Sequence, residues 1–400
     1  MTSAADRIRR LVRHPVSVLA ASTLSITLGA LPIFLVGALA VFIRPEMGFG
    51  EARLGALATV YYLFSAVSTV LGGRVSERLG GPGAMSVAAA LSLAGLLGVA
   101  LVAETWTGLA VLLAICGIAN GLAFPSSNLA IARGVPLRRQ GVAFGVKQSA
   151  GPYAVLLAGA SVPLIGTTIG WRWAFGIAAV TALPIIAGYR IRQNAPARSR
   201  GSRAEVERGP IWVLSAAAFL AVSGTASLGA FYVESAVSAG VSPSLAGTML
   251  ALGSVVGVAN RIGWGWIADR NRDAHFAIVS TLLVLGGAAF ASLGFVGGAL
   301  SLFGITVFVF SIGWAWPSVL SFAVVHRSPQ APGTASGILG AGQFGGGILG
   351  PLVFGIVVEA ASYRAAWGAA AGMILAAGAC ALVGGRWLER RIATKKGATA

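Results

Sequence analysis

Residues 15–43 read PVSVLAASTLSITLGALPIFLVGALAVFI, an uncharged run preceded by the arginines of residues 7–13. The run is longer than the roughly 7–15 apolar residues of a signal peptide, and no cleavage site ends it. At about 1.5 Å per residue, a helix of this length crosses the roughly 30 Å apolar core of a bilayer. The stretch predicts a first membrane-spanning helix that stays attached to the chain.

The composition extends this prediction to all 400 residues. Charged residues make up 10% of the sequence, apolar residues make up 56%, and another 56 residues are glycine. Soluble domains carry about 25% charged residues. The polar residues that remain are too few to cover a soluble fold, and a disordered chain needs the opposite bias. The sequence predicts an integral membrane protein.

Twelve apolar segments are long enough to span a bilayer as helices. They are too long for barrel strands and do not alternate apolar with polar residues. Their approximate limits are 16–43, 53–73, 83–103, 107–131, 141–165, 171–189, 211–233, 245–268, 275–297, 301–325, 333–357 and 365–385. The expected fold class is an all-α membrane protein with twelve transmembrane helices.

A polar segment, RIRQNAPARSRGSRAEVERGP at residues 190–210, separates the sixth and seventh spans. Its arginine and proline content predicts a flexible cytoplasmic linker, and a nucleic-acid-binding arm is the alternative. We expect a six-helix bundle at residues 1–189, the linker at 190–210 and a second six-helix bundle at 211–400.

The basic residues sort to one side of the predicted membrane. If the N-terminus is cytoplasmic, 24 Lys and Arg residues lie in cytoplasmic segments, Arg261 among them, and Lys147 lies within a span. The four outside are Arg44, Arg53, Arg172 and Arg364. This split predicts a cytoplasmic-membrane protein with both termini inside. It also accounts for the net charge of +17 without a nucleic-acid partner.

The two halves repeat each other at a constant offset of 192 residues. Matching pairs include Gly48 with Gly240, Gly55 with Gly247, Gly73 with Gly265, Pro125 with Pro317, and Arg172 with Arg364. A parallel repeat of six helices predicts two pseudo-symmetric bundles about an axis along the membrane normal, with a binding site between them near mid-membrane.

Two matching loops carry a glycine followed by an acid beside an arginine. The first reads GRVSERLG at residues 73–80, and the second reads GWIADR at residues 265–270. They resemble the G-x-L-A-D-R-x-G signature of the major facilitator superfamily. The second copy is the better match, whereas the first has Glu77 in place of Asp.

The resemblance covers nearly the whole chain. It implies that the loops control alternation between inward and outward states, through Glu77, Arg78, Asp269 and Arg270. The alternative is that these charges only set the topology.

Lys147 is the exceptional charge, because it lies about seven residues, or roughly 10 Å, into the fifth span. Placing a charge within a span costs about 2.5–3.5 kcal/mol on insertion scales. We expect an anionic substrate to neutralise it. The alternative is that its stem reaches back to the cytoplasmic interface. All twelve acids lie in loops or at span ends, and Glu234, at the outer end of span seven, is the nearest candidate for proton coupling.

Polar and aromatic residues elsewhere in the spans are the other candidate ligands. Most of the polar ones have no polar counterpart in the repeat, so architecture alone does not explain them. Asparagine and glutamine can bind substrate or join helices by hydrogen bonds, and the aromatic residues can form cavity walls or pack against lipid. The candidates are Asn120, Asn128, Gln148 and Gln343 as ligands and Tyr61, Tyr62, Trp314 and Trp316 as walls.

No motif supports an enzyme. Cys116 and Cys380 lie in apolar stretches, and the three histidines are scattered, so we expect no catalytic group, metal site or cofactor. The expected partners are a small anionic molecule and membrane lipid, with a coupling ion as an open question, and we expect a monomer.

Three functions are compatible with this sequence, and they differ in the support they have. The first is a secondary active or facilitative transporter of a small organic anion such as a carboxylate. Members of the resembled family with a Lys-Gln pair in span five are similar to this chain at Lys147-Gln148. The second is a proton-coupled efflux antiporter for drugs or amphipathic metabolites, but the arginine usual in its span four is replaced by Gly117. No feature supports the third, a receptor or scaffold.

Overall fold

The computed structural model describes residues 15–136, 140–190, 208–270, 274–328 and 332–397, and every regular element in these ranges is a helix. The N-terminal half contains α2 (Pro15–Ala38), α3 (Ala40–Met47), α4 (Glu51–Val102), α5 (Trp106–Gly134), α6 (Gln140–Gln148), α7 (Ala150–Ser161), η2 (Val162–Gly166), α8 (Trp171–Val180) and α9 (Leu183–Arg190). The C-terminal half contains α10 (Arg208–Ser238), α11 (Pro243–Arg270), α12 (His275–Ser292), η3 (Leu293–Phe295), α13 (Ala299–Phe308), η4 (Val309–Gly313), α14 (Trp316–Arg327), α15 (Pro332–Ala360) and α16 (Tyr363–Gly397).

The predicted spans match the helices of the structure. Within the described residues, eleven helical segments are long and apolar enough to cross a membrane, and the predicted sixth span matches a shorter apolar segment, Trp171–Ala187. Helices suit this composition because a helix satisfies its own backbone hydrogen bonds where no water is present. The prediction of an all-α membrane protein is confirmed.

Several predicted boundaries differ from the observed ones. The first span was expected as one helix, but the chain turns at Leu39 and continues as the short α3. Residues 73–79 were assigned to a loop, yet they belong to α4, and the chain turns at Gly80 with φ of 74°. Glycine takes this left-handed conformation without a Cβ clash. Residues 208–210, assigned to the linker, begin α10, and residues 191–207 lie outside the described ranges.

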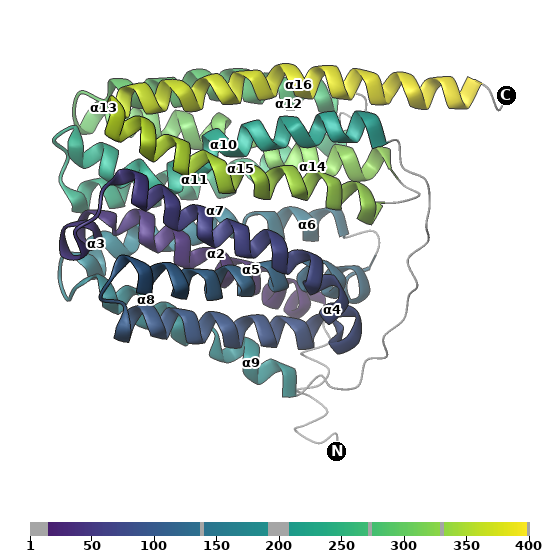
Figure 1. Cartoon of the computed structure of the whole chain (residues 1–400). Helices are drawn as coiled ribbons and strands as arrows, with labels where there is room; N and C mark the ends of the chain where they lie inside the picture. The colour runs from purple at the N-terminus through teal and green to yellow at the C-terminus, as the bar shows by residue number, and fades with distance from the viewer. Residues whose placement is uncertain (1–14, 137–139, 191–207, 271–273, 329–331, 398–400) are drawn as a thin grey trace.

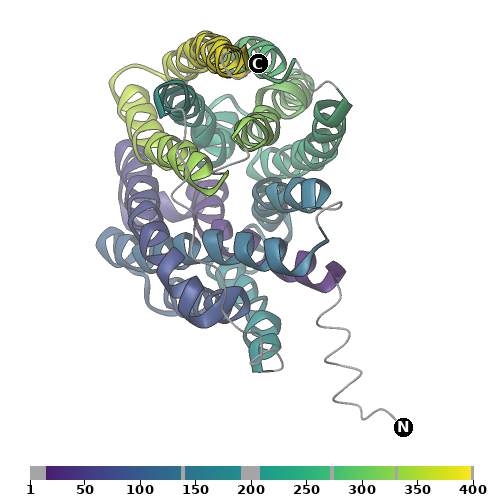
Figure 2. The same ribbon diagram turned by 90° about the vertical axis from the view of Figure 1, so that its right-hand side faces the viewer.

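The helices form two groups that pack along a common interface (Figures 1 and 2). The end of α9, the start of α10 and the end of α16 lie at one end of the molecule, which we call the linker end. The short α3 lies at the opposite end, which we call the Arg44 end. Between the halves, α2 packs against α10, α4 against α15, and α7 against α11.

These contacts obey the repeat found in the sequence. A Cβ atom at Gly37 would lie 2.1 Å from the carbonyl oxygen of Gly229, its own counterpart at the 192-residue offset. A Cβ at Gly55 would lie 2.2 Å from the oxygen of Pro351, and one at Gly247 would lie 2.7 Å from the oxygen of Gly159. The second and third contacts are equivalent in the repeat, because Gly55 matches Gly247 and Gly159 matches Pro351 at the 192-residue offset. The predicted pseudo-twofold axis therefore passes between Gly37 and Gly229.

Four glycines of the interface helices have open space beside them toward the linker end. Apart from neighbouring residues of the same helix, no atom of a described residue lies within 4 Å of a Cβ built on Gly73, Gly145, Gly263 or Gly337. The same helices are in backbone contact through Gly55 and Gly247. These helices therefore have backbone contact between the halves at Gly55 and Gly247 and open space beside these four glycines.

Replacing Gly37 by Ala should lower the melting temperature of the purified protein by several degrees, because its Cβ would collide with the backbone of the other half. Gly372→Ala is the matched control, since no described atom lies within 4 Å of its Cβ position. Alanine in a helix interior is about 1 kcal/mol more favourable than glycine, so the control should be unchanged or slightly more stable. Equal melting temperatures for the two variants would contradict the close contact on the axis.

Candidate functional site

Lys147 is buried near the end of α6, with 2% of its surface exposed. Its Nζ donates a hydrogen bond to Oδ1 of Asn128 on α5 and lies 4.3 Å from the centroid of the Phe124 ring. The Phe124 ring packs edge-on against Phe344 of α15, with 6.1 Å between ring centroids. The ammonium is thus inside the protein, beside a ring pair that joins the two halves.

Gln148 follows Lys147 and contacts the C-terminal half. Its Nε2 is 3.5 Å from Oγ of Ser321 on α14, and its carbonyl oxygen accepts a hydrogen bond from Nη1 of Arg261 on α11. The helix breaks at Ser149, between α6 and α7, which leaves carbonyl groups near the break available to other donors. Lys147 and Gln148 therefore lie where α6 meets α11 and α14.

Arg261 belongs to this junction, although the sequence analysis counted it among the cytoplasmic loop charges. The structure places Arg261 inside α11, which continues for nine residues beyond it. The guanidinium is 7% exposed and lies 5.1 Å from the centroid of the Trp314 ring. Its position within the apolar segment 245–268 was the available signal, but the positive-inside pattern gave a simpler explanation for any arginine near a span end.

Other predicted ligands are less closely connected with Lys147. Nδ2 of Asn120 donates to Oγ of Ser65 at 3.2 Å, so this side chain joins α5 to α4 inside the N-terminal half. This is the interhelical role that the sequence left open. Gln343 is half-buried on α15 next to Phe344 and makes no hydrogen bond to another described residue.

Of the aromatic residues predicted as cavity walls, some contact the other half and others lie within their own half. Trp314 faces the junction, where it contacts Arg261 and packs edge-on against Phe34 of α2. Tyr62 lies against Gly347 of α15. Tyr61 is instead buried within its own half, where its hydroxyl donates to the carbonyl oxygen of Gly29 at 2.6 Å.

Trp316, the remaining aromatic candidate, is fully buried. Both Tyr61 and Trp316 are buried in this structure, and their role as cavity walls stays a prediction. Their sequence context could not reveal this, since helix rotation decides which face meets the other half.

The proposed gating residues lie at the linker end. Arg78 is exposed there, two residues before the turn at Gly80. The side chains of Glu77, Asp269 and Arg270 lie outside the described part of the structure. Control of alternation by these four residues stays a prediction.

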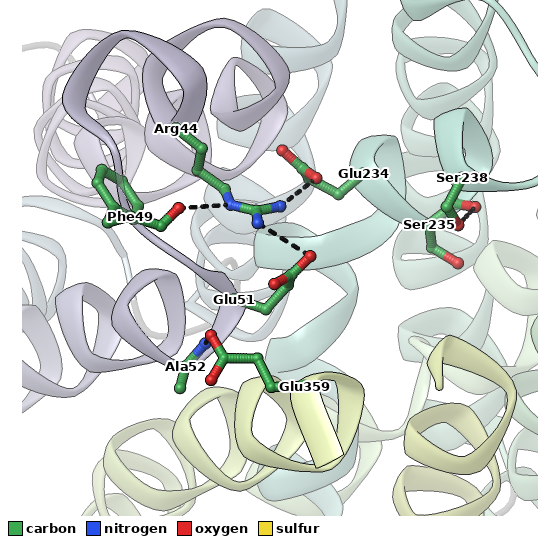
Figure 3. A network of polar contacts seen from close by, with 8 residues as sticks. All are labelled: Arg44, Phe49, Glu51, Ala52, Glu234, Ser235, Ser238 and Glu359. Carbon is green, nitrogen blue, oxygen red and sulfur yellow. Dashed lines mark hydrogen bonds and ion pairs between the residues drawn. The ribbon is translucent and has the colours of Figure 1, made fainter. Parts of the chain in front are cut away.

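The Arg44 end carries an ion-pair network between the halves (Figure 3). Nη1 of Arg44 on α3 lies 2.6 Å from Oε2 of Glu234 on α10, and Nη2 lies 2.9 Å from Oε1 of Glu51 on α4. Burial disfavours the charged guanidinium, but Glu234 and Glu51 together raise the pKa of Arg44 above its ordinary value. Arg44 therefore stays positively charged and connects two carboxylates, one from each half.

A second polar contact joins the two halves at the Arg44 end. Oε1 of Glu359 on α15 accepts a hydrogen bond from the backbone nitrogen of Ala52 at 2.9 Å. Ala52 lies in the first turn of α4, where backbone N–H groups have no partner within the helix and favour a negative charge. Arg44 and Glu234 also line a cavity of about 450 Å³ at this end. The role of Glu234 in proton coupling stays a prediction.

Comparison with known proteins agrees with this architecture. The family model of the Major Facilitator Superfamily matches residues 16–351. The chain therefore belongs to the major facilitator superfamily, and it is a multi-pass membrane protein.

Two similar proteins illustrate the range of the family. The probable sulfoacetate transporter SauU of Cupriavidus necator is 30% identical over 148 residues, which are 36% of this chain and 33% of that protein. The match thus spans about a third of that relative's length. A bacterial homolog to the human lysosomal transporter Spinster, solved in an inward-facing and unoccupied conformation, has a TM-score of 0.70 at 15% identity. It covers 94% of this chain and 98% of its own, and it supports the fold alone.

Glu234→Gln should weaken the contact between the halves at the Arg44 end, because Arg44 keeps Glu51 in its own half but loses its charged partner across the interface. Spin labels at positions 53 and 239, on opposite halves, should report a longer distance in part of the population. Arg172→Gln is the matched control, since Arg172 pairs with Glu46 inside the N-terminal half. Unchanged distances in Glu234→Gln would show that the ion pair does not hold this end closed.

Proposed function

We propose that this transporter carries a small organic anion, such as a carboxylate or sulfonate, by alternating access through the site beside Lys147. The observation that carries the proposal is an ammonium buried inside the protein beside the Phe124–Phe344 ring pair, which joins the two halves. A negatively charged ligand interacts strongly with an ammonium in a medium of low dielectric constant.

The surrounding chemistry supports the same ligand. Gln148 supplies an amide at the junction, and Trp314 and Tyr62 supply aromatic surface between the halves. A site of apolar walls with a few placed polar groups is typical for a small molecule. The similarity to a probable sulfoacetate transporter adds support, because sulfoacetate is a small organic anion.

The transport cycle follows from the two ends of the interface. We propose that the linker end faces the cytoplasm of a cell whose cytoplasmic membrane holds the protein, as the arginine distribution predicts. The site then opens inward when the Arg44 end is closed. Rocking of the halves about the Gly37–Gly229 contact would break the Arg44–Glu234 pair and expose the site outward.

Efflux of drugs is the alternative, and the packing of span four argues against its usual arginine site. A Cβ at Gly117 would lie 2.4 Å from the carbonyl oxygen of Tyr61. The position therefore has no room for a long side chain in this packing. Expression in cells that lack efflux pumps should give no protection against dyes or antibiotics, and protection would favour the antiporter.

Lys147→Ala should reduce uptake of radiolabelled acetate, succinate or sulfoacetate into proteoliposomes at least about tenfold, because one lost charge contact of about 1.4 kcal/mol already has that effect. Lys147→Arg keeps the charge and should retain part of the activity. Arg386→Gln, an exposed arginine on α16, is the control and should transport normally. Full activity in Lys147→Ala, or no anion uptake by the unmodified protein, would contradict the proposal.

A further inference from the structure

Arg261 is a second buried cation at the junction, and it comes from the opposite half to Lys147. It lies nine residues before the end of α11, which places it about 14 Å from the linker end of that helix. Its side chain is 7% exposed. A charge at this depth is costly, and in membrane proteins such residues commonly mark a substrate or ion pathway.

The contacts of Arg261 leave its charge uncompensated among the described residues. Nη1 donates to the carbonyl oxygen of Gln148, and Nε lies 3.4 Å from the carbonyl oxygen of Trp314. Within the described ranges, no carboxylate pairs with the guanidinium, and Nη2 donates no hydrogen bond. Because a guanidinium has five N–H donors, Arg261 has capacity for a further acceptor.

Lys147 and Arg261 approach the junction from two sides. Lys147 precedes Gln148, whose carbonyl group Arg261 contacts, and α6 packs against α11. Each cation also has its own aromatic neighbour, Phe124 for Lys147 and Trp314 for Arg261. The two positive groups are therefore held by different halves and by different rings.

We propose that Arg261 is the second anion contact of the substrate site and that the transported molecule carries two anionic groups, one for each cation. This inference rests on the proposed function, because it adds a second charge to the same site. A molecule with two negative groups can reach both cations, whereas a monoanion reaches one of them. Charged acceptors bind N–H donors about twice as strongly as neutral ones, so an anionic oxygen can replace the Gln148 carbonyl.

The geometry also gives such a substrate a part in the conformational cycle. Lys147 moves with the N-terminal half and Arg261 with the C-terminal half. A ligand with one anionic group on each cation attracts both halves toward itself. Binding thereby favours closure around the site, and a monoanion lacks this effect.

A purely structural role for Arg261 makes a different prediction. In that case Arg261 would only join α11 to the helix break after Gln148, and its removal would weaken binding of every ligand by a similar factor. A residue that binds the second anionic group changes the ratio between ligands with one and two such groups. The ratio is therefore the informative measurement.

The test is a thermal-shift titration of the purified full-length protein with carboxylates matched in chain length. Malonate is compared with propionate, and succinate with butyrate. For the unmodified protein, each dicarboxylate should reach half of its maximal shift at a concentration at least about tenfold lower than its monocarboxylate, the equivalent of about 1.4 kcal/mol. In Arg261→Gln this ratio should fall to about one, while monocarboxylates still bind. Arg261→Lys should keep an intermediate ratio, and Arg386→Gln should behave as the unmodified protein.

Three results would overturn the inference. They are equal binding of mono- and dicarboxylates by the unmodified protein, a preserved ratio in Arg261→Gln, and a uniform loss for all ligands in that variant. The first needs no variant, so it holds even if Arg261→Gln does not fold. Failure of the proposed function gives a distinct result, since the unmodified protein would then bind none of the four carboxylates.

Discussion

The contact between Gly37 and Gly229 is the constraint on which the arrangement of the two halves depends. These glycines are equivalent in the repeat and touch each other across the pseudo-twofold axis. A Cβ at Gly37 would collide with the backbone of α10, and a Cβ at Gly229 would collide with the ring of Phe34 on α2. The same repeat pairs Gly55 with Pro351 and Gly247 with Gly159 on both sides of the axis. Backbone contact through small residues is how helices associate where lipid removes the hydrophobic driving force.

The polar contacts between the halves differ between the Arg44 end of the interface and its interior. At the Arg44 end, Arg44, Glu234 and Glu51 pair opposite charges, and Glu359 accepts a hydrogen bond from the start of α4. Deeper in the molecule, Lys147 and Arg261 contact amide, carbonyl and aromatic groups. Ion pairs within the protein join the halves at the Arg44 end, whereas we propose that the buried cations bind an anionic ligand. In this proposal, closure and binding use different residues of one interface.

The candidate site shows where the sequence stopped being informative. Lys147 was identifiable because a charge inside an apolar span is costly wherever the span faces. Asn128 and Phe124 lie one helical turn apart on α5, and the structure brings both to Lys147. Asn120, two turns from Asn128 on the same helix, instead contacts Ser65. Tyr61 and Tyr62 are adjacent in sequence, yet one is buried in its own bundle and the other meets α15. The rotation of each helix about its axis decides which neighbours a side chain contacts. In apolar spans, the sequence has little periodic pattern from which this rotation could be predicted.

The membrane class, the helical spans and the twofold repeat can all be derived from the amino-acid sequence, because hydrophobic length and a fixed 192-residue offset are properties of the linear chain. The sequence also isolated Lys147 as a charge that needs an explanation. Tertiary structure decided that Arg261 faces the junction rather than the membrane surface, and that Arg44 and Glu234 close the opposite end. Those contacts join residues more than a hundred positions apart, and only the packing of one half against the other brings their atoms together.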